Sequence, residues 1–297
     1  MSIAAPWPLK FQVGARTLWS VRRTLVRLPL SLADARNGAL PALPPLGGAD
    51  GYLVTSLPEA LAPRLAGDGL IAVVRQRYTR YFADLTVGFD AWWAGLSGNT
   101  RSGLKRKVKK LGALDVRRYR TPDEVETFHR LAREVAAKTY QERLLGAGLP
   151  DTPEFQAAML ARAAAGAVRA WLLFVDGVAA AYLYCPVDGG VVRYDYVGHD
   201  PALAELSPGA VLQLEAMRDL FAEGGLVAFD FTEGEGQHKR SMASGGIDCV
   251  DLLLLRPTLA NRAVVAALAG FDRAVALAKA GVARAGAQDW AKRVRRG

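Results

Sequence analysis

The chain has 297 residues, a length that fits one large domain or two domains of ordinary size. Hydrophobic residues make up 51% of the chain and charged residues 23%, which allows a buried core and excludes the compositionally disordered class. The formal net charge of +9 predicts an anionic partner. That partner could be a nucleotide, an acidic lipid or a nucleic acid, because net charge does not distinguish them.

Cysteine usage and the first residues indicate a cytoplasmic protein. Cys185 and Cys249 lie in apolar, strand-like runs, and the sequence has no CxxC motif or disulfide framework, which fits a reducing compartment. Residues 1–11 lack the charged region followed by an apolar stretch that marks a signal peptide. No apolar run approaches the roughly 20 residues that a membrane-spanning helix needs.

The first part of the chain combines irregular and strand-like segments with one basic helix. Residues 1–50 are rich in Pro and Arg, and residues 40–48 predict a loop. Ser97 is a suitable N-cap for a basic helix, which Gly112 is expected to end. Strands are predicted before this helix, over residues 51–56 and 70–85.

After the basic helix, the sequence contains further helix-start signals and a hairpin signal. Thr121 is the expected N-cap of a helix, with Glu124 completing a capping box, and Thr152 begins a second helix. Asp176-Gly177 predicts a tight hairpin between two strands. A strand is also predicted over 115–120, and the later elements are strand, helix, strand, strand and helix over 191–198, 208–223, 226–234, 247–255 and 258–287. Residues 113–256 therefore have the element order β-α-α-β-β-β-α-β-β.

Four features occur in an informative order and spacing. They are the capped basic helix, the strand pair split by Asp-Gly, a strand followed by Leu-Ser-Pro-Gly and an Ala/Leu-rich helix, and the pattern FDFxxGxxxxK from Phe229 to Lys239. With them, residues 97–243 resemble the GNAT superfamily of acyltransferases, in particular its cellulose-biosynthesis-type (CelD/BcsL) branch. The chain is also distantly similar to the Fem-type peptidyltransferases, which carry two GNAT-like halves.

The resemblance implies an α/β (α+β) fold. We expect a GNAT-like mixed, largely antiparallel sheet flanked by helices, arranged as two GNAT-like halves. The expected domains are a partial GNAT-like half over 1–112, a GNAT acyltransferase domain over 113–257 and a basic amphipathic helix over 258–297.

The resemblance also implies a donor site where the third strand leads into the next helix. In the GNAT fold the pantetheine arm of an acyl-CoA lies beside the central strand, and its pyrophosphate lies on amides at the helix start. Pro208 suits the first helical position, because its missing N–H would have no partner there. A simple helix cap is the structural alternative for this segment. The implied cofactor-binding residues are Leu206, Ser207, Gly209, Ala210 and Val211.

Acyl transfer to an amine requires a base, a polarised thioester carbonyl and a stabilised leaving thiolate. The structural alternative to a catalytic role for Asp195 is an ion pair with Arg193. For Asp200 the structural alternative is the formation of a turn. His129 is expected on the surface of a helix. The three His and two Cys residues show no metal-ligand spacing, so no metal is expected. The predicted catalytic residues are Asp195, Tyr196, His199, Asp230 and Lys239, and the predicted substrate-binding residues are Tyr194, Asp200, Glu233 and His238.

Basic segments widen the choice of partners. Residues 101–120 hold nine Lys or Arg and one acid, and residues 259–297 hold eight Lys or Arg and two acids. Solvated helix faces, CoA phosphates, RNA and an anionic membrane surface all fit such segments. The N-terminal segment 17–32 also mixes apolar residues with Arg.

The sequence thus predicts an acyl-CoA-dependent N-acyltransferase. It would act on the amine of a cell-envelope glycan or lipid, such as an amino sugar or a sphingoid-type base. The expected partners are acyl-CoA, an amine acceptor and an anionic membrane surface at the inner face, rather than nucleic acid. The alternatives are a Fem-type transferase that uses aminoacyl-tRNA and a non-catalytic GNAT-like ligand-binding module.

Overall fold

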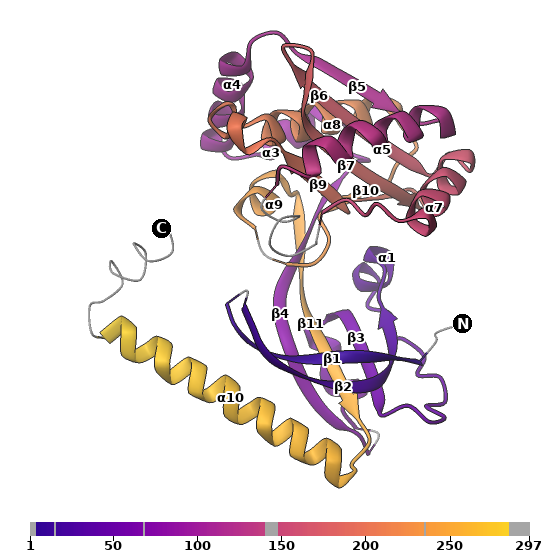
Figure 1. Cartoon of the computed structure of the whole chain (residues 1–297), viewed down its shortest axis with the longest axis vertical. Coiled ribbons are helices and arrows are strands. Elements are labelled where there is room, and N and C mark those ends of the chain that lie inside the picture. The colour runs from indigo at the N-terminus through magenta and orange to yellow at the C-terminus, as the bar shows by residue number, and fades with distance from the viewer. Residues whose placement is uncertain (1–3, 15, 68, 140–147, 235, 285–297) are drawn as a thin grey trace. The chain divides into compact units, whose positions relative to one another are not determined.

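The structure is a computed structural model that describes residues 4–14, 16–67, 69–139, 148–234 and 236–284 (Figure 1). Its contacts divide the chain into two compact units. Unit 1 takes in residues 1–77 and 248–297, and unit 2 takes in residues 78–247. Strands β4 (Ile71–Asp84) and β11 (Gly245–Leu255) contribute residues to both units. The division expected at residues 112 and 257 stays a prediction.

Unit 1 is built on strands in the order β1, β2, β3, β11 and β4. β2 and β3 pair in parallel, whereas β1 with β2 and β3 with β11 pair antiparallel. Helix α10 (Leu259–Arg284) buries Val264 and Leu268 in one cluster with Leu9 and Phe11 of β1. The other elements are β1 (Ala4–Val13), β2 (Arg16–Pro29), α1 (Leu32–Arg36), β3 (Gly51–Pro58), η1 (Glu59–Leu61) and α2 (Ala62–Leu65).

The hairpin of β1 and β2 lies within residues 1–50, which are rich in Pro and Arg. The sequence predicted a loop at 40–48 in this segment and no strand. β1 contains Pro6 and Pro8, which sequence reasoning treats as strand breakers. Because β1 is the edge strand, a residue without an N–H can be accommodated there. Buried Leu9 and Phe11 flank exposed Lys10, which is the alternation of a strand with one face on the core.

Unit 2 has a mixed, largely antiparallel sheet. Its strands follow the order β4, β10, β8, β7, β6 and β5, and β9 also pairs with β7. Only β10 and β8 pair in parallel among the described strands of this unit. The strands are β5 (Asp115–Tyr119), β6 (Val168–Val175), β7 (Val178–Asp188), β8 (Val191–Arg193), β9 (Tyr196–His199) and β10 (Ala228–Asp230). This sheet and its helices confirm the predicted fold class.

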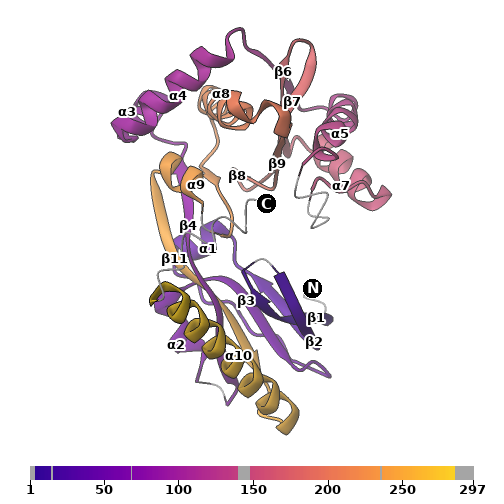
Figure 2. The same cartoon turned by 60° about the vertical axis from the view of Figure 1, so that its left-hand side comes forward.

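Helices cover both faces of this sheet, as Figure 2 shows. One core cluster joins α3, α4 and α8 to the sheet, and a second joins α5 and α7 to its other face. The two layers explain why β6 and β7 are apolar along nearly their whole length. The helical elements are α3 (Phe89–Gly95), α4 (Gly98–Leu111), α5 (Pro122–Ala136), α7 (Pro153–Ala164), η2 (Pro201–Leu206), α8 (Pro208–Glu223) and α9 (Gln237–Met242).

The predicted start and turn signals are confirmed. Ser97 caps α4 by accepting the Thr100 amide, and Thr121 forms a capping box with Glu124. Asp176 and Gly177 both have positive φ, as a tight hairpin between β6 and β7 requires. These signals succeed because each depends on a few neighbouring residues.

Two buried polar residues depart from what the sequence suggested. His129, expected on the surface, is 6% exposed, and its Nε2 lies 2.9 Å from the Pro150 carbonyl. Asp219 of α8 drew no attention in the sequence, yet it is buried and accepts a 2.8 Å hydrogen bond from Trp171 Nε1. It also pairs with Arg118 at 2.8 Å and Arg120 at 2.5 Å, which connects α8 to the end of strand β5.

Candidate donor-binding and active site

The site begins where strand β8 leaves its parallel partner. Arg193 is opposite Asp230 in the register of β8 and β10, and the Tyr194 amide donates to the Asp230 carbonyl at 2.9 Å. The chain then continues as β9, which among the described strands pairs with β7 alone. One edge of β9 is therefore left without a strand partner, and its backbone groups are available to a ligand.

The short 3-10 helix η2 connects β9 to helix α8. Asp200 caps η2 by accepting the Ala202 amide at 3.0 Å, and it pairs with Lys138 at 2.8 Å. The Lys138 hydrogen bond, followed by the Ala202 amide, lowers the pKa of the Asp200 carboxyl. This pairing keeps Asp200 charged and anchors the loop before α8.

Ser207 adopts the left-handed backbone conformation, with φ 54° and ψ 48°. Its carbonyl accepts the amides of Ala210 at 3.1 Å and Val211 at 3.3 Å. The Gly209 amide has no hydrogen-bond partner among the described residues. A free amide at the positive end of a 16-residue helix is suited to an anionic group.

A cavity of about 630 Å³ opens beside these elements. Its walls come from β9, η2, the start of α8, helix α4, the turn after α5 and helix α9. This volume lies within the range of small-molecule sites. The lining residues are Lys107, Thr139, Tyr194, Val197, Gly198, His199, Pro201, Ala204, Ser207, Gly209, Ala210, Gln213 and His238.

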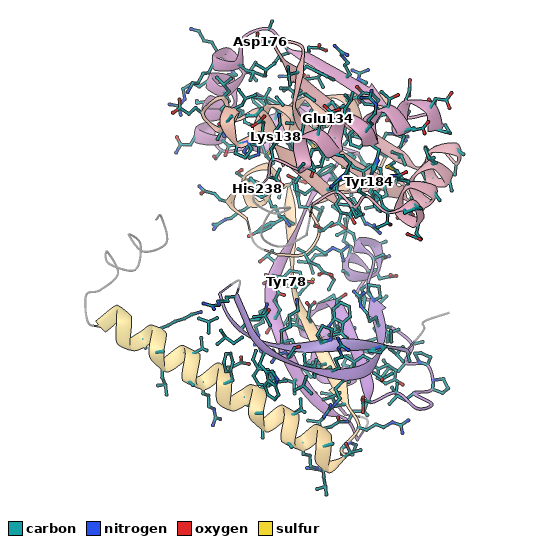
Figure 3. The ribbon with its side chains drawn as sticks, in the orientation of Figure 1. Tyr78, Glu134, Lys138, Asp176, Tyr184 and His238 are labelled. Carbon is teal, nitrogen blue, oxygen red and sulfur yellow. The ribbon has the colours of Figure 1, made fainter. Side chains whose placement is uncertain are left out.

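Two of the lining side chains carry groups suited to proton transfer. The rings of Tyr194 and His238 have centroids 6.1 Å apart. Partial desolvation, with the nearby Lys239 ammonium as a second cause, lowers the pKa of His238. Burial raises the pKa of the Tyr194 phenol. At neutral pH the imidazole is therefore a proton acceptor and the phenol keeps its proton. His238 and Lys138 are labelled in Figure 3.

The carboxylates predicted for catalysis have partners elsewhere. Asp195 is held by Arg193 through two contacts, at 2.6 and 3.1 Å. Asp230 is fully buried, pairs with Arg80 at 2.5 and 3.1 Å, and accepts the Thr232 amide at 2.9 Å. Both carboxylates are thus engaged in structural contacts.

Only some of the remaining predicted residues line the cavity. Lys239 Nζ donates to the Glu233 carbonyl at 2.6 Å, and burial lowers the pKa of this lysine. Tyr196 packs its ring on Phe155, with centroids 5.3 Å apart. The predicted residues that do line the cavity are Tyr194, His199, Ser207, Gly209, Ala210 and His238, whereas Asp195, Tyr196, Asp200, Leu206, Val211, Asp230, Glu233 and Lys239 do not. The roles assigned to all of them stay predictions.

Seven of the lining residues were not among the predicted site residues, and Lys107 and Gln213 are two of them. Lys107 lies in the basic helix, where its sequence signal was shared with many neighbours. Gln213 is 3% exposed, and its Nε2 has no hydrogen-bond partner in the described structure. An unpartnered buried amide costs about 1–3 kcal/mol of stability.

The close pairing of β9 with β7 can be tested at Gly198. A Cβ there would lie 2.4 Å from Tyr182 Cε1, and Tyr182 is 1% exposed and cannot easily move. We expect Gly198→Ala to lower the free energy of unfolding by about 1–3 kcal/mol, measured by urea denaturation, because the strand pair must separate.

The matched control is Gly103→Ala in helix α4. A Cβ at Gly103 meets no atom within 4 Å, so the same chemical change should leave stability unchanged or slightly raised. Equal stability of the two variants would show that Gly198 is not required for the close pairing of β9 with β7.

The split strand and the helix that follows it define the GNAT class of fold, and two solved structures share it. One is the C-terminal domain of a protein assigned as a lysylphosphatidylglycerol synthetase from Agrobacterium fabrum, with 14% identity, 75% of this chain and 73% of that chain covered, and a TM-score of 0.52. The other is FemX, with 9% identity, coverage of 84% and 88%, and a TM-score of 0.52. At such identities the similarity establishes the fold alone.

The sequence itself matches one protein family. Residues 98–240 match the model of the acetyltransferase (GNAT) domain, and this span contains every residue that lines the cavity. No curated protein sequence matches the chain. The narrower assignment to the cellulose-biosynthesis-type branch stays a prediction.

None of the described helices is both long and apolar enough to cross a membrane. Within the same residues, no group of three or more His, Cys, Asp or Glu side chains is arranged to hold a metal ion.

Proposed function

We propose that this protein is an acyl-CoA-dependent N-acyltransferase that acts on an amine of a cell-envelope glycan or lipid. The observation that carries the proposal is the cavity between the unpaired edge of β9 and the start of α8. The match of residues 98–240 to an acetyltransferase domain supports the same reaction class.

The donor fits the charges around the cavity. Its diphosphate would lie near the free Gly209 amide, with the α8 dipole favouring negative charge. Lys107 lines the same cavity and supplies a cation. The pantetheine arm would then run along β9, whose free edge can pair with its amide groups.

The chemistry needs one proton acceptor and one proton donor. His238 takes the proton from the acceptor ammonium, and the free amine attacks the thioester carbonyl. A C–N bond forms and the C–S bond breaks, so the acyl group moves to nitrogen. Tyr194, which keeps its proton, supplies a proton to the leaving thiolate. As the amide forms, its nitrogen gives up a second proton, which restores the Tyr194 phenol. The products are an amide, CoA as its thiol and the one proton held by His238, which passes to solvent.

Binding and turnover test the proposal separately. Calorimetry with CoA should show a complex, and thiol release should be measured with acyl-CoAs of several lengths, each with an amino sugar or a sphingoid base. Absence of CoA binding would refute the donor assignment. Binding without turnover on any amine would favour the non-catalytic module.

An aminoacyl-tRNA donor is the second candidate. Helix α4 carries five Lys or Arg residues between positions 105 and 110, which suits a polyanion. This donor is the one that the resemblance to Fem-type transferases implies. Salt-sensitive tRNA binding in a protein that does not bind CoA would favour it.

We also propose that unit 1 contacts an anionic membrane surface through the hairpin of β1 and β2. Leu18 and Trp19, near the start of β2, are 56% and 61% exposed. Residues 1–33 contain five Lys or Arg and no Asp or Glu. Exposed apolar side chains within a purely basic segment fit an acidic lipid surface.

The expected result is that the double variant Leu18→Ser/Trp19→Ser binds vesicles of phosphatidylglycerol and phosphatidylcholine at least about tenfold more weakly in a low-salt sedimentation assay. Val178→Ser, which removes an apolar side chain exposed to 60% in unit 2, is the control and should bind like the wild type. Wild-type protein that leaves these vesicles unbound at low salt would contradict the membrane proposal.

A further inference from the structure

We propose that Lys107 and Lys110 of helix α4 bind a phosphate monoester of the donor, separate from the diphosphate assigned to the start of α8. In an acyl-CoA this group is the 3′-phosphate of the ribose. The inference rests on the proposed function and deepens it, because it makes the nucleotide end of the donor a determinant of specificity.

The position of the two lysines on α4 is the first step of the argument. Helix α4 packs on unit 2 through an apolar face, with Leu104 buried in the core cluster and Val108 packed against it. Lys107 lies at one edge of this face and lines the cavity. With about 3.6 residues per turn, Lys110 lies about 60° around the helix from Lys107, and Lys109 about 160°. Lys110 is therefore the next cation on the cavity side, whereas Lys109 lies at the opposite edge.

The charges of α4 are the second step. The helix carries six Lys or Arg and no acid, and none of the six forms an ion pair within the part of the chain that the structure describes. Like charges three residues apart, such as Lys107 and Lys110, destabilise a helix. The helix dipole favours Lys109 and Lys110 in the last turn, but it does not extend to Lys105, Arg106 and Lys107. An anionic group bound beside the cavity offsets this repulsion.

The charge of the donor is the third step. A phosphate monoester carries about −1.5 to −2 charge at neutral pH, in addition to the charge of the diphosphate. The start of α8 offers only about +0.5 through its dipole, so Lys107 alone leaves the donor under-neutralised. Side chains three residues apart on a helix have Cβ atoms about 5–6 Å apart, which lets Lys107 and Lys110 hold one phosphate between them.

The lysines next to other lining residues are already engaged. Lys138, which precedes the lining residue Thr139, pairs with Asp200 at 2.8 Å. Lys239, which follows the lining residue His238, donates to the Glu233 carbonyl at 2.6 Å. The uncommitted positive charge beside the cavity therefore comes from α4.

Lys110→Gln tests the inference, because it removes one ammonium from an exposed position and keeps a polar side chain. Calorimetry at fixed ionic strength would compare CoA with 3′-dephospho-CoA, which lacks only the monoester. We expect the wild type to bind CoA about tenfold more tightly, and Lys110→Gln to narrow this preference to about threefold or less. The affinity of the variant for 3′-dephospho-CoA should stay within about twofold of the wild type. Its KM for acyl-CoA should rise while kcat is unchanged.

Lys109→Gln is the matched control, since it removes the same charge from the same turn at the opposite edge of α4. It should keep the wild-type preference for CoA. An unchanged preference in Lys110→Gln, or an equal loss of preference in both variants, overturns this inference. A wild type that binds CoA and 3′-dephospho-CoA equally well also overturns it and leaves the proposed function standing. A wild type that binds neither compound overturns the proposed function with it.

Discussion

His238→Gln is expected to lower kcat by roughly 100- to 1,000-fold while CoA still binds, because the variant keeps a polar side chain at the cavity but cannot accept the proton of the acceptor ammonium. CoA release under saturating acyl-CoA and amine would measure the loss, and calorimetry would confirm that the donor site survives. A loss of this size with intact binding separates proton transfer from donor recognition.

The direction of the His238 pKa shift also predicts how the rate depends on pH. His238 acts as a base only when neutral, and its pKa is lowered first by desolvation and second by the Lys239 ammonium. The rate should therefore be constant above the ordinary histidine value of 6.5 and fall on the acid side at a midpoint below it. Lys239→Met removes the second cause, so it should move that midpoint to higher pH.

Two histidines serve as comparisons. His129→Gln changes a residue that does not line the cavity, so its kcat should match the wild type. His199 does line the cavity and was predicted to be catalytic from the sequence. If His199→Gln abolishes the acid limb while His238→Gln retains it, the base is His199 and our assignment is wrong.

The parts of the fold that sequence predicted are those set by near neighbours. The caps at Ser97 and Thr121 and the Asp176-Gly177 hairpin each depend on residues within a few positions. The β1–β2 hairpin was missed because Pro6 and Pro8 argue against a strand unless its place at the sheet edge is known. Edge position is a property of the whole sheet.

The same distinction applies to the site. The donor segment is continuous in sequence from β9 to the start of α8, so its residues could be named before their geometry was known. Asp230 looked available because Arg80, its partner, lies 150 residues away in the chain. Gln213 looked ordinary because one polar residue in a helix carries no signal until its burial is known. Which side chains pair and which are buried is set by the packing of distant parts of the chain, so a local sequence pattern does not predict either.

The buried Arg80–Asp230 pair should have a large effect on stability. Both side chains lie in unit 2, on adjacent strands β4 and β10, with 6% and 0% of the side chain exposed. Asp230→Ala leaves the Arg80 guanidinium without its carboxylate, and we expect the free energy of unfolding to fall by about 3–5 kcal/mol in urea denaturation. Asp115→Ala breaks an exposed pair with Arg117 and should leave the unfolding midpoint nearly unchanged.

The double variant Arg80→Met/Asp230→Leu distinguishes a structural pair from a catalytic carboxylate. Replacing both charges with apolar side chains removes the uncompensated guanidinium, so much of the stability lost in Asp230→Ala should return. If Asp230 serves the fold, a restored double variant should also regain CoA binding and turnover, because β10 again supports the point where β8 separates from it. Restored stability without turnover would instead support the catalytic role that the sequence predicted for Asp230.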